Sequence, residues 1–346
     1  MSEIRTCGWD IGGAHVKLAG IDAGGRVLFV DQYAAPLWRG PEVLGQVLER
    51  LAAMPDVAAA RHAVTMTGEL ADCFIDRPSG VAAILQRFTD IFPADTVQVY
   101  AGQSGFLAPA AARQAGARIA SANWLATTTW AAARYKSGVL VDIGSTTTDI
   151  IPFRNQAACP VGKTDFERLR SGELLYTGIV RTPIMALVRR VPYGSQWQPV
   201  IAEAFATMAD IYRLTGDLKP HHDLMDTPDG RGKTEQDSAR RLARMLGLDL
   251  APDKPLDEWI RLARHISREQ IKIINEVLFR IGSGPARLLV GAGSGRFLVR
   301  ELARYQGCES VEFDAHLDMD DILRDKASDC ATAVAVAQLA RQSPGS

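Results

Sequence analysis

Two segments of the sequence, far apart, each place an aspartate beside a glycine-containing turn. The first is Gly8–Ala14 (GWDIGGA) and the second is Val141–Thr147 (VDIGSTT). Each follows a β-prone run and continues into a second apolar stretch, which predicts a hairpin with an aspartate at the mouth of its tight turn. Glycine lets backbone N–H groups approach an anion closely, and an adjacent carboxylate can hold Mg²⁺. Two such hairpins facing each other would bind a di- or triphosphate from both sides.

A third segment, Leu288–Leu298 (LLVGAGSGRFL), is typical of a strand, a glycine-rich turn and a helix that runs to about Gln306. One interpretation is a Rossmann-type or methyltransferase-type turn, since Glu312 follows roughly twenty residues later, where a ribose-binding acid would lie. The spacing is GxGxG rather than GxGxxG, however. With the two aspartate turns upstream, we instead interpret it as the surface that receives a nucleotide base or an equivalent substrate group, through Gly291, Gly293, Gly295 and Arg296.

The composition is that of an ordinary globular protein. At 346 residues the chain is long enough for two lobes with substantial cores, and 47% of its residues are apolar and 23% charged. The formal net charge of −1 argues against nucleic acid as the main partner. We find no long apolar run and no apolar signal region, so we expect no transmembrane helix, no membrane partner and a cytoplasmic location. The five cysteines are scattered without a CxxC pair, which disfavours a disulfide framework.

The first third of the sequence alternates strands and helices, which predicts a mixed α/β sheet covered by helices. Strands are expected at Arg5–Asp10, His15–Asp22, Arg26–Tyr33, Arg61–Met66 and Thr96–Tyr100. Helices are expected at Pro41–Met54, Ser79–Phe92, Gly105–Ala115 and Ser121–Tyr135.

From about Phe166 to Gly282 the chain is expected to be mainly helical. Helices are predicted at Pro199–Thr215, Asp237–Gly247 and Leu256–Ile281, with a final helix of small apolar residues at Ser328–Arg341. Between them lies a polar loop, Gly216–Thr234, which is interpreted equally as a solvated linker or as a flap that covers substrate. The cluster His221-His222-Asp223 in this loop is expected to be solvated rather than to bind zinc.

With these segments in place, the chain resembles the superfamily of acetate and sugar kinases, heat-shock ATPases and actin over nearly its whole length. Asp10–Lys17 and Asp142–Asp149 resemble the two phosphate motifs of that superfamily, and Gly291–Arg296 resembles its adenosine motif. The resemblance implies an α/β, actin-like ATPase fold in which two lobes arise by duplication, each with a ribonuclease-H-like sheet, and ligand binds in a central cleft.

The same resemblance implies a division of the chain into lobes. The first lobe would span residues 1–136, and the second would span residues 137–327. The second lobe would carry a helical insertion at about 166–282. The final helix, 328–342, would pack back on the first lobe.

Within the superfamily, Asp142–Ile150 resembles the hydantoinase/oxoprolinase branch. The chain is more similar still to a smaller group of that branch, which is linked to tetrahydromethanopterin-dependent one-carbon metabolism and includes a synthase of methanofuran biosynthesis. The segments that carry this resemblance are Asp10–Ala14, Thr67–Phe74, Ala209–Arg213, Thr227–Gly232 and Arg240–Gly247. Two features depart from the simplest kinase pattern: nothing marks a site for an acceptor hydroxyl, and Ser145 replaces the more usual second glycine.

The resemblance to this group implies a transferase of methanofuran or methylofuran biosynthesis. The enzyme would join an aminomethylfuran-methyl diphosphate to the phenol of a tyramine- or tyrosine-containing glutamyl compound, form an aryl ether and release diphosphate. Its site would stabilise the departing diphosphate, orient the phenol and exclude water. The expected partners are therefore a small-molecule diphosphate and a phenolic acceptor. Mg²⁺ is the expected cofactor and ATP is not required; the oligomeric state is left open.

The resemblance also implies which residues bind metal and phosphate. Asp10, Asp142 and Asp149 would bind Mg²⁺, directly or through water, with Asp10 and Asp142 as catalytic carboxylates. Lys17 would add positive charge, or it would be an ordinary lysine at a strand edge. Backbone N–H and hydroxyl donors to the diphosphate would come from Gly12, Gly13, Gly144, Ser145, Thr146 and Thr147.

Four further residues are candidates for roles on the acceptor. Glu69 and Asp72 are candidates to accept the phenolic proton, although Glu69 would alternatively hydrogen-bond its own turn. Arg213 and Arg231 are candidates to bind glutamyl carboxylates, or they are ordinary surface arginines.

Two other functions remain as alternatives. One is an ATP-dependent kinase or a lactam-hydrolysing enzyme like the wider hydantoinase/oxoprolinase branch. The other is a nucleotide-switched interaction protein of the actin or chaperone type, which is disfavoured because Ser346 follows soon after the last helix with no attached substrate-binding domain.

Overall fold

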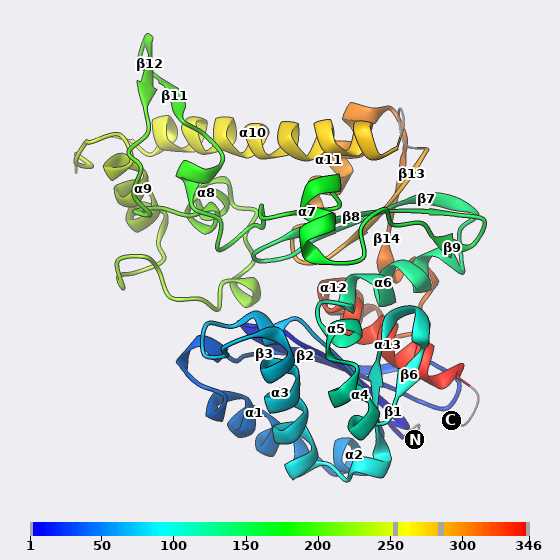
Figure 1. Ribbon diagram of the computed structural model, residues 1–346. Coiled ribbons are helices and arrows are strands. Elements are labelled where there is room, and N and C mark those ends of the chain that lie inside the picture. The colour runs from blue at the N-terminus through cyan, green and yellow to red at the C-terminus, as the bar shows by residue number, and fades with distance from the viewer. Residues whose placement is uncertain (1–2, 252–254, 283–286, 344–346) are drawn as a thin grey trace. The chain divides into compact units, whose positions relative to one another are not determined.

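The chain forms two compact units (Figure 1). The computed structural model describes residues 3–251, 255–282 and 287–343. Unit 1 comprises Met1–Leu140, Phe153–Cys159 and Glu312–Ser346, and unit 2 comprises Val141–Pro152 and Pro160–Val311.

Residues 137–140, 153–159 and 312–327 were expected in the second lobe, and they belong here to unit 1. For residues 312–327 the reason is a set of contacts with Arg26 and Val27 near the start of the third strand. The Arg26 guanidinium bonds to Asp318 at 2.8 Å and to Asp320 at 2.6 Å. The backbone N–H of Val27 donates to the carbonyl of Asp318 at 2.8 Å.

Unit 1 is built on a six-stranded mixed sheet with the order β3-β2-β1-β4-β5-β6. β1 pairs antiparallel with β2 and parallel with β4, and β4 pairs parallel with β5. The five strands predicted in this part of the chain are confirmed, with ends that shift by no more than one residue. The strands are β1 (Thr6–Ile11), β2 (His15–Ile21), β3 (Val27–Ala34), β4 (Arg61–Met66), β5 (Val97–Tyr100) and β6 (Phe106–Leu107).

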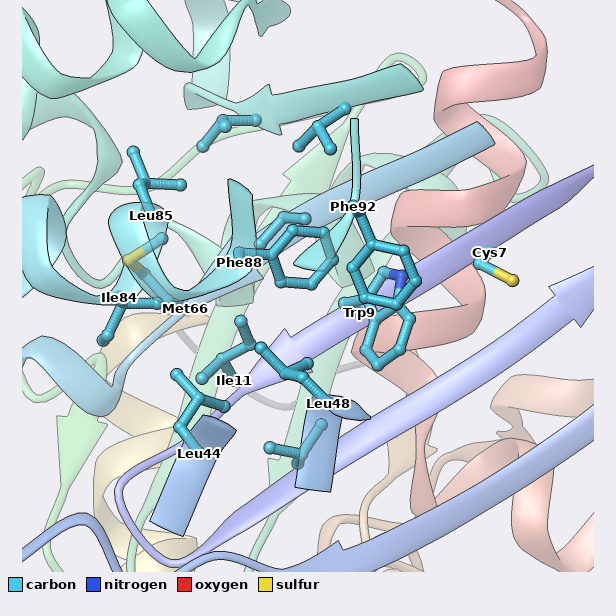
Figure 2. Close-up of a cluster of buried hydrophobic side chains, with 14 of the residues drawn as sticks. Cys7, Trp9, Ile11, Leu44, Leu48, Met66, Ile84, Leu85, Phe88 and Phe92 are labelled. Atoms are coloured by element: carbon cyan, nitrogen blue, oxygen red, sulfur yellow. The ribbon is translucent and has the colours of Figure 1, made fainter. Parts of the chain in front are cut away.

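Two sets of helices pack on this sheet. Side chains alternate along β1, so Trp9 and Gly8 point to opposite faces. Trp9 packs edge-on against Phe88 of α3, with ring centroids 5.2 Å apart, in the apolar core that Figure 2 shows. On the Gly8 face, α13 approaches so closely that a side chain at Gly8 would overlap the backbone of Ala333. The helices are α1 (Glu42–Ala52), α2 (Pro55–Ala58), α3 (Arg77–Ile91), α4 (Pro109–Gln114), α5 (Gly116–Ile119), α6 (Asn123–Ala132), α12 (Arg324–Asp329) and α13 (Ala331–Arg341).

Unit 2 is built on a second sheet with the order β10-β8-β7-β13-β14. In each sheet the later strands are added next to the first strand of a hairpin: β4 lies beside β1, and β13 lies beside β7. The order β10-β8-β7-β13-β14 therefore repeats the order β3-β2-β1-β4-β5. A separate hairpin is formed by β11 and β12. The strands are β7 (Ser137–Ile143), β8 (Thr148–Arg154), β9 (Ala157–Ala158), β10 (Leu174–Leu175), β11 (Arg190–Tyr193), β12 (Gln196–Pro199), β13 (Leu288–Ala292) and β14 (Glu309–Glu312).

Some helices of unit 2 begin at threonines that satisfy one of their first backbone N–H groups. Thr207 and Thr234 start α8 and α9 with capping boxes, in which Asp210 and Asp237 complete the pairing. The long helix α10 packs against α8 and α11 (Figure 1). The helices are α7 (Asp165–Ser171), α8 (Met208–Thr215), α9 (Glu235–Arg244), α10 (Asp257–Ile281) and α11 (Phe297–Gln306).

Two predicted helices are wrong in part. The helix expected over Pro199–Thr215 begins only at Met208, because Pro199 ends β12 and lies opposite Arg190 in the hairpin. The helix expected over Gly105–Ala115 begins at Pro109, because Gly105 has a φ of 72° and the next two residues form β6. In the segment Pro199–Thr215, apolar residues recur at helical spacing from its start, but the residues before Met208 form the end of β12 and a loop.

Two further observations concern membrane-spanning helices and disulfides. Within the described part of the chain, no helix has both the length and the apolar character that a membrane span requires. All five cysteines are free thiols.

Candidate functional site

The first aspartate turn joins β1 to β2 in unit 1. The N–H of Gly12 donates to the carbonyl of His15 at 2.9 Å and closes the turn. Asp10 is buried on the strand before it, and Lys17 lies opposite on β2, with its Nζ atom 3.8 Å from Asp10 Oδ2. Lys17 therefore offsets part of the charge of Asp10 and lies beside this turn rather than alone at a strand edge.

The residues after β4 pack against this first turn. The N–H of Thr67 donates to the carbonyl of Ile11 at 3.0 Å. A side chain at Gly68 would lie 3.1 Å from the carbonyl oxygens of Ile11 and Gly12. The segment beginning at Thr67, singled out from the sequence, is thus a structural neighbour of the Asp10 turn.

The two candidate proton acceptors of this segment lie in different environments. Glu69 is 1% exposed, and its Oε1 accepts a hydrogen bond from the Ser121 hydroxyl at 3.0 Å. Ser121 adopts a φ of 50°, an uncommon conformation for a residue other than glycine. Asp72 is exposed. Glu69 is therefore a buried, hydrogen-bonded carboxyl group, whereas Asp72 is solvated.

Cys330 lies in the same unit, within electrostatic range of Asp10 and Lys17. Burial raises the pKa of its thiol to about 12, against a smaller opposing effect of Lys17. The thiol is therefore neutral at physiological pH, and this removes it as a nucleophile at the turn.

The second aspartate turn joins β7 to β8 and closes in the same way as the first. The N–H of Gly144 donates to the carbonyl of Thr147 at 2.9 Å. In both turns the donor glycine is the second residue after the aspartate and the acceptor is the fifth. The predicted duplication thus extends to the hydrogen bond that closes each turn.

The third glycine-rich segment is packed on the second turn. A side chain at Gly293 would overlap Asp142 Oδ1, and one at Gly295 would lie 2.5 Å from Ile143 Cγ2. The N–H of Gly295 donates to the carbonyl of Ile143 at 2.8 Å. The structure therefore brings together two of the segments that the sequence singled out.

Arg296 and Gly291 have structural contacts within this segment. Arg296 is 5% exposed and donates from Nη1 to the carbonyl of Gly293 at 3.1 Å, which braces the turn. A side chain at Gly291 would lie 3.3 Å from Val299 of α11, so this glycine allows the helix to approach β13. Binding of a nucleotide or substrate by these two residues stays a prediction.

Asp149 lies on β8, in the predicted metal set, and its carboxylate forms an ion pair with Arg168 of α7. The Arg168 side chain is only 2% exposed and lies 3.7 Å from a second carboxylate, that of Asp165. A carboxylate engaged by a buried guanidinium is a poor ligand for a cation. Of the three predicted metal ligands, Asp149 therefore fits Mg²⁺ least.

The expectation that Arg213 is a surface residue is wrong. Arg213 is 9% exposed and donates to Asp210 at 2.9 Å and to Asp223 at 2.7 and 2.6 Å. Arg241 of α9 is also buried and bonds to both Asp210 and Asp229. Asp210 and Arg213 are three residues apart on α8, but the other pairs join α8, α9 and the polar loop, so helical spacing did not reveal them.

The polar loop Gly216–Thr234 is fixed to this network. Asp223 and Asp229 accept hydrogen bonds from Arg213 and Arg241, and His222 is only 4% exposed. The expectations of a solvated His222 and of a merely solvated linker are therefore wrong for these residues. Arg231 is exposed. Covering of substrate by this loop stays a prediction.

Comparison with known proteins supports the motif analysis. Residues 61–342 match the family model for hydantoinase/oxoprolinase. The chain is 32% identical to (4-{4-[2-(γ-L-glutamylamino)ethyl]phenoxymethyl}furan-2-yl)methanamine synthase of Methanocaldococcus jannaschii, over 79% of this chain and 81% of the relative. It is 34% identical to the enzyme of the same name from Methanococcus vannielii, over 41% of this chain and 66% of that one.

The chain belongs to the hydantoinase/oxoprolinase family. This confirms the family resemblance drawn from the motifs. A solved structure of nucleotide-free acetone carboxylase, from work on ATP-dependent acetone carboxylation, superposes with a TM-score of 0.58 and 11% identity over 98% of this chain and 70% of that chain. At this identity the likeness concerns the fold alone, and with the repeated strand order it confirms the predicted two-lobed α/β fold class.

In this hydantoinase/oxoprolinase family member, the segment Thr177–Thr182 supports the second turn and was missed in the sequence. Its N–H groups at Gly178, Ile179 and Val180 donate to the carbonyls of Thr146, Gly144 and Ser145, each at 3.0 Å. A side chain at Gly178 would overlap the Thr146 backbone. The available signal was a Thr-Gly pair after a short strand, too common to single out.

Two buried side chains hold that supporting segment of the family member. Gln270 of α10 donates from Nε2 to the carbonyl and hydroxyl of Thr177 at 2.9 and 2.8 Å. Tyr212 of α8 donates its hydroxyl to Gln270 Oε1 at 2.5 Å, and burial raises the Tyr212 pKa well above its usual value. The second turn is thereby connected to the helical part of unit 2.

The oxygen-rich composition of the turns fits a hard cation. Asp142 is followed by the hydroxyl groups of Ser145, Thr146 and Thr147, all partly exposed. Mg²⁺ prefers carboxylate and other oxygen ligands and retains several waters. The residues of this turn therefore suit a hydrated Mg²⁺ bound together with phosphate. At the first turn, Lys17 already offsets part of the negative charge of Asp10, so this aspartate would attract Mg²⁺ less strongly, while the lysine would attract phosphate.

Proposed function

We propose that this protein is a transferase of methanofuran biosynthesis. It joins an aminomethylfuran-methyl diphosphate to the phenol of a γ-glutamyltyramine-type acceptor and releases diphosphate. The observation that carries the proposal is the 32% identity to a synthase over 79% of the chain. That synthase is named for a phenoxymethyl-furan product, which contains an aryl ether and a γ-glutamylamino group.

The proposed reaction exchanges one bond to carbon for another. The bond between the furfuryl methylene carbon and the diphosphate oxygen breaks, and its electron pair leaves with the diphosphate. The phenolic oxygen forms the new bond to the same carbon, and its proton passes to a carboxylate. The furan ring stabilises positive charge at the attached carbon, so the main tasks of the protein are to stabilise the leaving group and orient the phenol.

Backbone N–H and hydroxyl groups of the two turns are the proposed donors to the diphosphate. In unit 2 these are Ser145, Thr146 and Thr147, and in unit 1 the donor is Gly13, with Lys17 as an added positive charge. The N–H groups of Gly12 and Gly144, which were also expected to donate to the diphosphate, close the two turns instead. Groups held in place before the reaction stabilise the charge that develops on the leaving group without having to reorganise. Mg²⁺, when held beside a turn by its aspartate, would supply further positive charge to the phosphate oxygens.

Glu69 is the proposed acceptor of the phenolic proton, with Asp72 as the solvated alternative. Glu69 is buried in the segment that packs against the Asp10 turn. Its hydrogen bond from Ser121 fixes the orientation of the carboxyl group.

The deciding experiment supplies furfuryl-type diphosphate, γ-glutamyltyramine and Mg²⁺ to the purified protein in the absence of ATP. We expect mass spectrometry to detect the aryl ether together with released pyrophosphate, because the substrate already carries an activated leaving group. The alternative is an ATP-dependent kinase or hydrolase of the same family. ADP formed in step with a phosphorylated or hydrolysed product, without any ether, would establish that alternative and reject the transferase.

A further inference from the structure

Three consecutive carbonyl groups of the second turn are bonded to one neighbouring segment of unit 2. The carbonyls of Gly144, Ser145 and Thr146 accept hydrogen bonds of 2.9 to 3.0 Å from the backbone N–H groups of residues 178–181. Each of these three peptide groups is therefore held on its carbonyl side, and the orientation of the turn depends on the position of the segment 178–181.

The N–H groups that belong to the same three peptides point away from that segment. A trans peptide places its C=O and N–H bonds on opposite sides, and every described peptide bond is trans. The N–H groups in question are those of Ser145, Thr146 and Thr147, and no described residue accepts a hydrogen bond from any of them. Successive N–H groups of a turn that face one side form a concavity that binds anions.

A single buried side chain of α10 holds the beginning of the supporting segment. Gln270 is fully buried, and its Nε2 donates to the carbonyl and the hydroxyl of Thr177 at 2.9 and 2.8 Å. The same Nε2 lies 3.3 Å from the carbonyl of Gly178. A glutamine amide nitrogen carries only two hydrogens, so these contacts use its whole donor capacity. Gln270 is thus bonded at the point where the segment 178–181 begins.

Tyr212 fixes which end of the Gln270 amide faces Thr177. Its hydroxyl donates to Gln270 Oε1 at 2.5 Å, and the Ser267 hydroxyl donates to the Tyr212 oxygen at 3.4 Å. The two ends of an amide are similar in shape but opposite in hydrogen-bonding character. A donor placed at Oε1 therefore favours the arrangement in which Nε2 faces Thr177.

We propose that Gln270 is a positioning residue for the diphosphate: through Thr177 and the segment 178–181, it keeps the three N–H groups of the second turn directed at the phosphate oxygens. This inference rests on the proposed function. Gln270 is buried and acts through the segment rather than by contact with the ligand. Without it, the peptides of the turn could rotate and present carbonyl oxygens, which repel phosphate. Donors that are already oriented stabilise the departing charge without reorganisation.

A purely structural role for Gln270 has a different consequence. If the amide only satisfied buried polar groups, its loss would lower the free energy of unfolding, and the molecules that remain folded would bind diphosphate with unchanged affinity. The affinity of the folded protein therefore separates the two roles.

Calorimetric titration of the full-length protein with pyrophosphate in the presence of Mg²⁺ tests the proposal. Gln270→Leu keeps a side chain of similar size without the amide, and we expect the Kd to rise about 10- to 100-fold. Tyr212→Phe leaves Gln270 in place and keeps the ring that packs edge-on against Phe297, so we expect a rise of only about 2- to 5-fold. Calorimetry fits the number of sites separately from the Kd, so partial unfolding does not imitate a loss of affinity.

Asn275→Leu is the matched control on the same helix. Asn275 accepts a hydrogen bond from Gln306 Nε2 at 2.8 Å, outside the segment 177–181, and its substitution is expected to leave the Kd unchanged. Hydrogen exchange of the Gly178, Ile179 and Val180 amides gives a second measurement that needs no ligand. Their protection should fall about 10-fold or more in Gln270→Leu and stay unchanged in Asn275→Leu.

Three results would overturn the role of Gln270: no binding of pyrophosphate to the unaltered protein, an unchanged Kd in Gln270→Leu, or an equal rise in Asn275→Leu. If Gln270→Leu does not fold, Tyr212→Phe decides, and an unchanged Kd in that variant overturns the role.

Failure of the proposed function is recognised separately, in the turnover assay, by the absence of ether. A raised Kd in Gln270→Leu together with an ATP-dependent product would retain the positioning role and reject the transferase. Ether formation with unchanged Kd and kcat in Gln270→Leu would reject the positioning role and retain the transferase.

Discussion

Gly293 lies against Asp142 so closely that any side chain at residue 293 would overlap the Oδ1 atom of the aspartate. Gly293 also has a φ of 79°, in the left-handed region that favours glycine. Two residues later, the N–H of Gly295 bonds to the carbonyl of Ile143. The turn after β13 therefore sets the position of the Asp142 carboxylate.

Gly293→Ala tests this relationship. Both the backbone conformation and the overlap with Asp142 oppose the new methyl group, so we expect a loss of about 2–4 kcal/mol in the free energy of unfolding. We also expect weaker Mg²⁺-dependent binding of pyrophosphate. Urea unfolding and calorimetry measure the two effects.

Gly307→Ala is the matched control for that substitution. Gly307 has a similar φ of 64°, but an added Cβ would meet no atom within 4 Å. We expect a loss of only about 1–2 kcal/mol and unchanged pyrophosphate binding. Equal effects of the two substitutions would show that the contact with Asp142 has no consequence.

Asp10→Asn and Asp142→Asn are expected each to abolish Mg²⁺-dependent pyrophosphate binding and to leave the fold intact. Both aspartates precede turns that close by the same hydrogen bond, and each substitution removes a negative charge that attracts Mg²⁺. Calorimetry with pyrophosphate and Mg²⁺ is the measurement. Asp95→Asn, at an exposed aspartate of unit 1, serves as the control. Wild-type affinity in both turn variants would contradict the roles proposed for the two turns.

Asp210→Ala is expected to destabilise the protein strongly. The carboxylate of Asp210 is fully buried and bonds to both Arg213 and Arg241, so its removal leaves two buried guanidinium groups without a shared partner. We expect a loss of about 3–5 kcal/mol in the free energy of unfolding, measured by urea titration. The exposed ion pair of Lys272 with Glu269 offers the comparison, and Glu269→Ala should change stability little. Similar losses in the two variants would argue against a stabilising network.

The attachment of the polar loop is expected to depend on pH through Asp223. Burial alone would raise the pKa of Asp223, but Arg213 and Lys233 outweigh it and hold the pKa below its usual range. A lowered pKa in the folded state contributes stability that is complete above the unfolded pKa of about 3.9 and is lost as the pH falls through the folded value. Below about pH 4, the protection of the Gly216–Thr234 amides from hydrogen exchange, taken relative to the intrinsic rate at each pH, should therefore fall.

Asp223→Asn tests the origin of that pH dependence. The asparagine cannot titrate, so the protection of the loop amides should already be lower at neutral pH and should vary less on acidification. The same acid response in the variant as in the unaltered protein would assign the effect to other carboxylates.

Much of this architecture was predicted from local patterns in the sequence. Turns such as Asp10–His15 depend on glycine and on strand residues within a few positions, so composition and spacing determine them. The long helix α10 was predicted to within one residue because its apolar side chains recur at helical spacing over many turns. The family was evident for the same reason, since its motifs are short and contiguous.

Tertiary structure alone decided which of these segments meet and which charges are paired. Gly178 supports the second turn, Gln270 holds Thr177, and Arg213 is held by Asp223, yet the members of each group are separated by a helix or a loop. The sequence determined the residue types and the local turns. Burial and ion pairing are set by long-range packing, which brings together residues that no local periodicity connects.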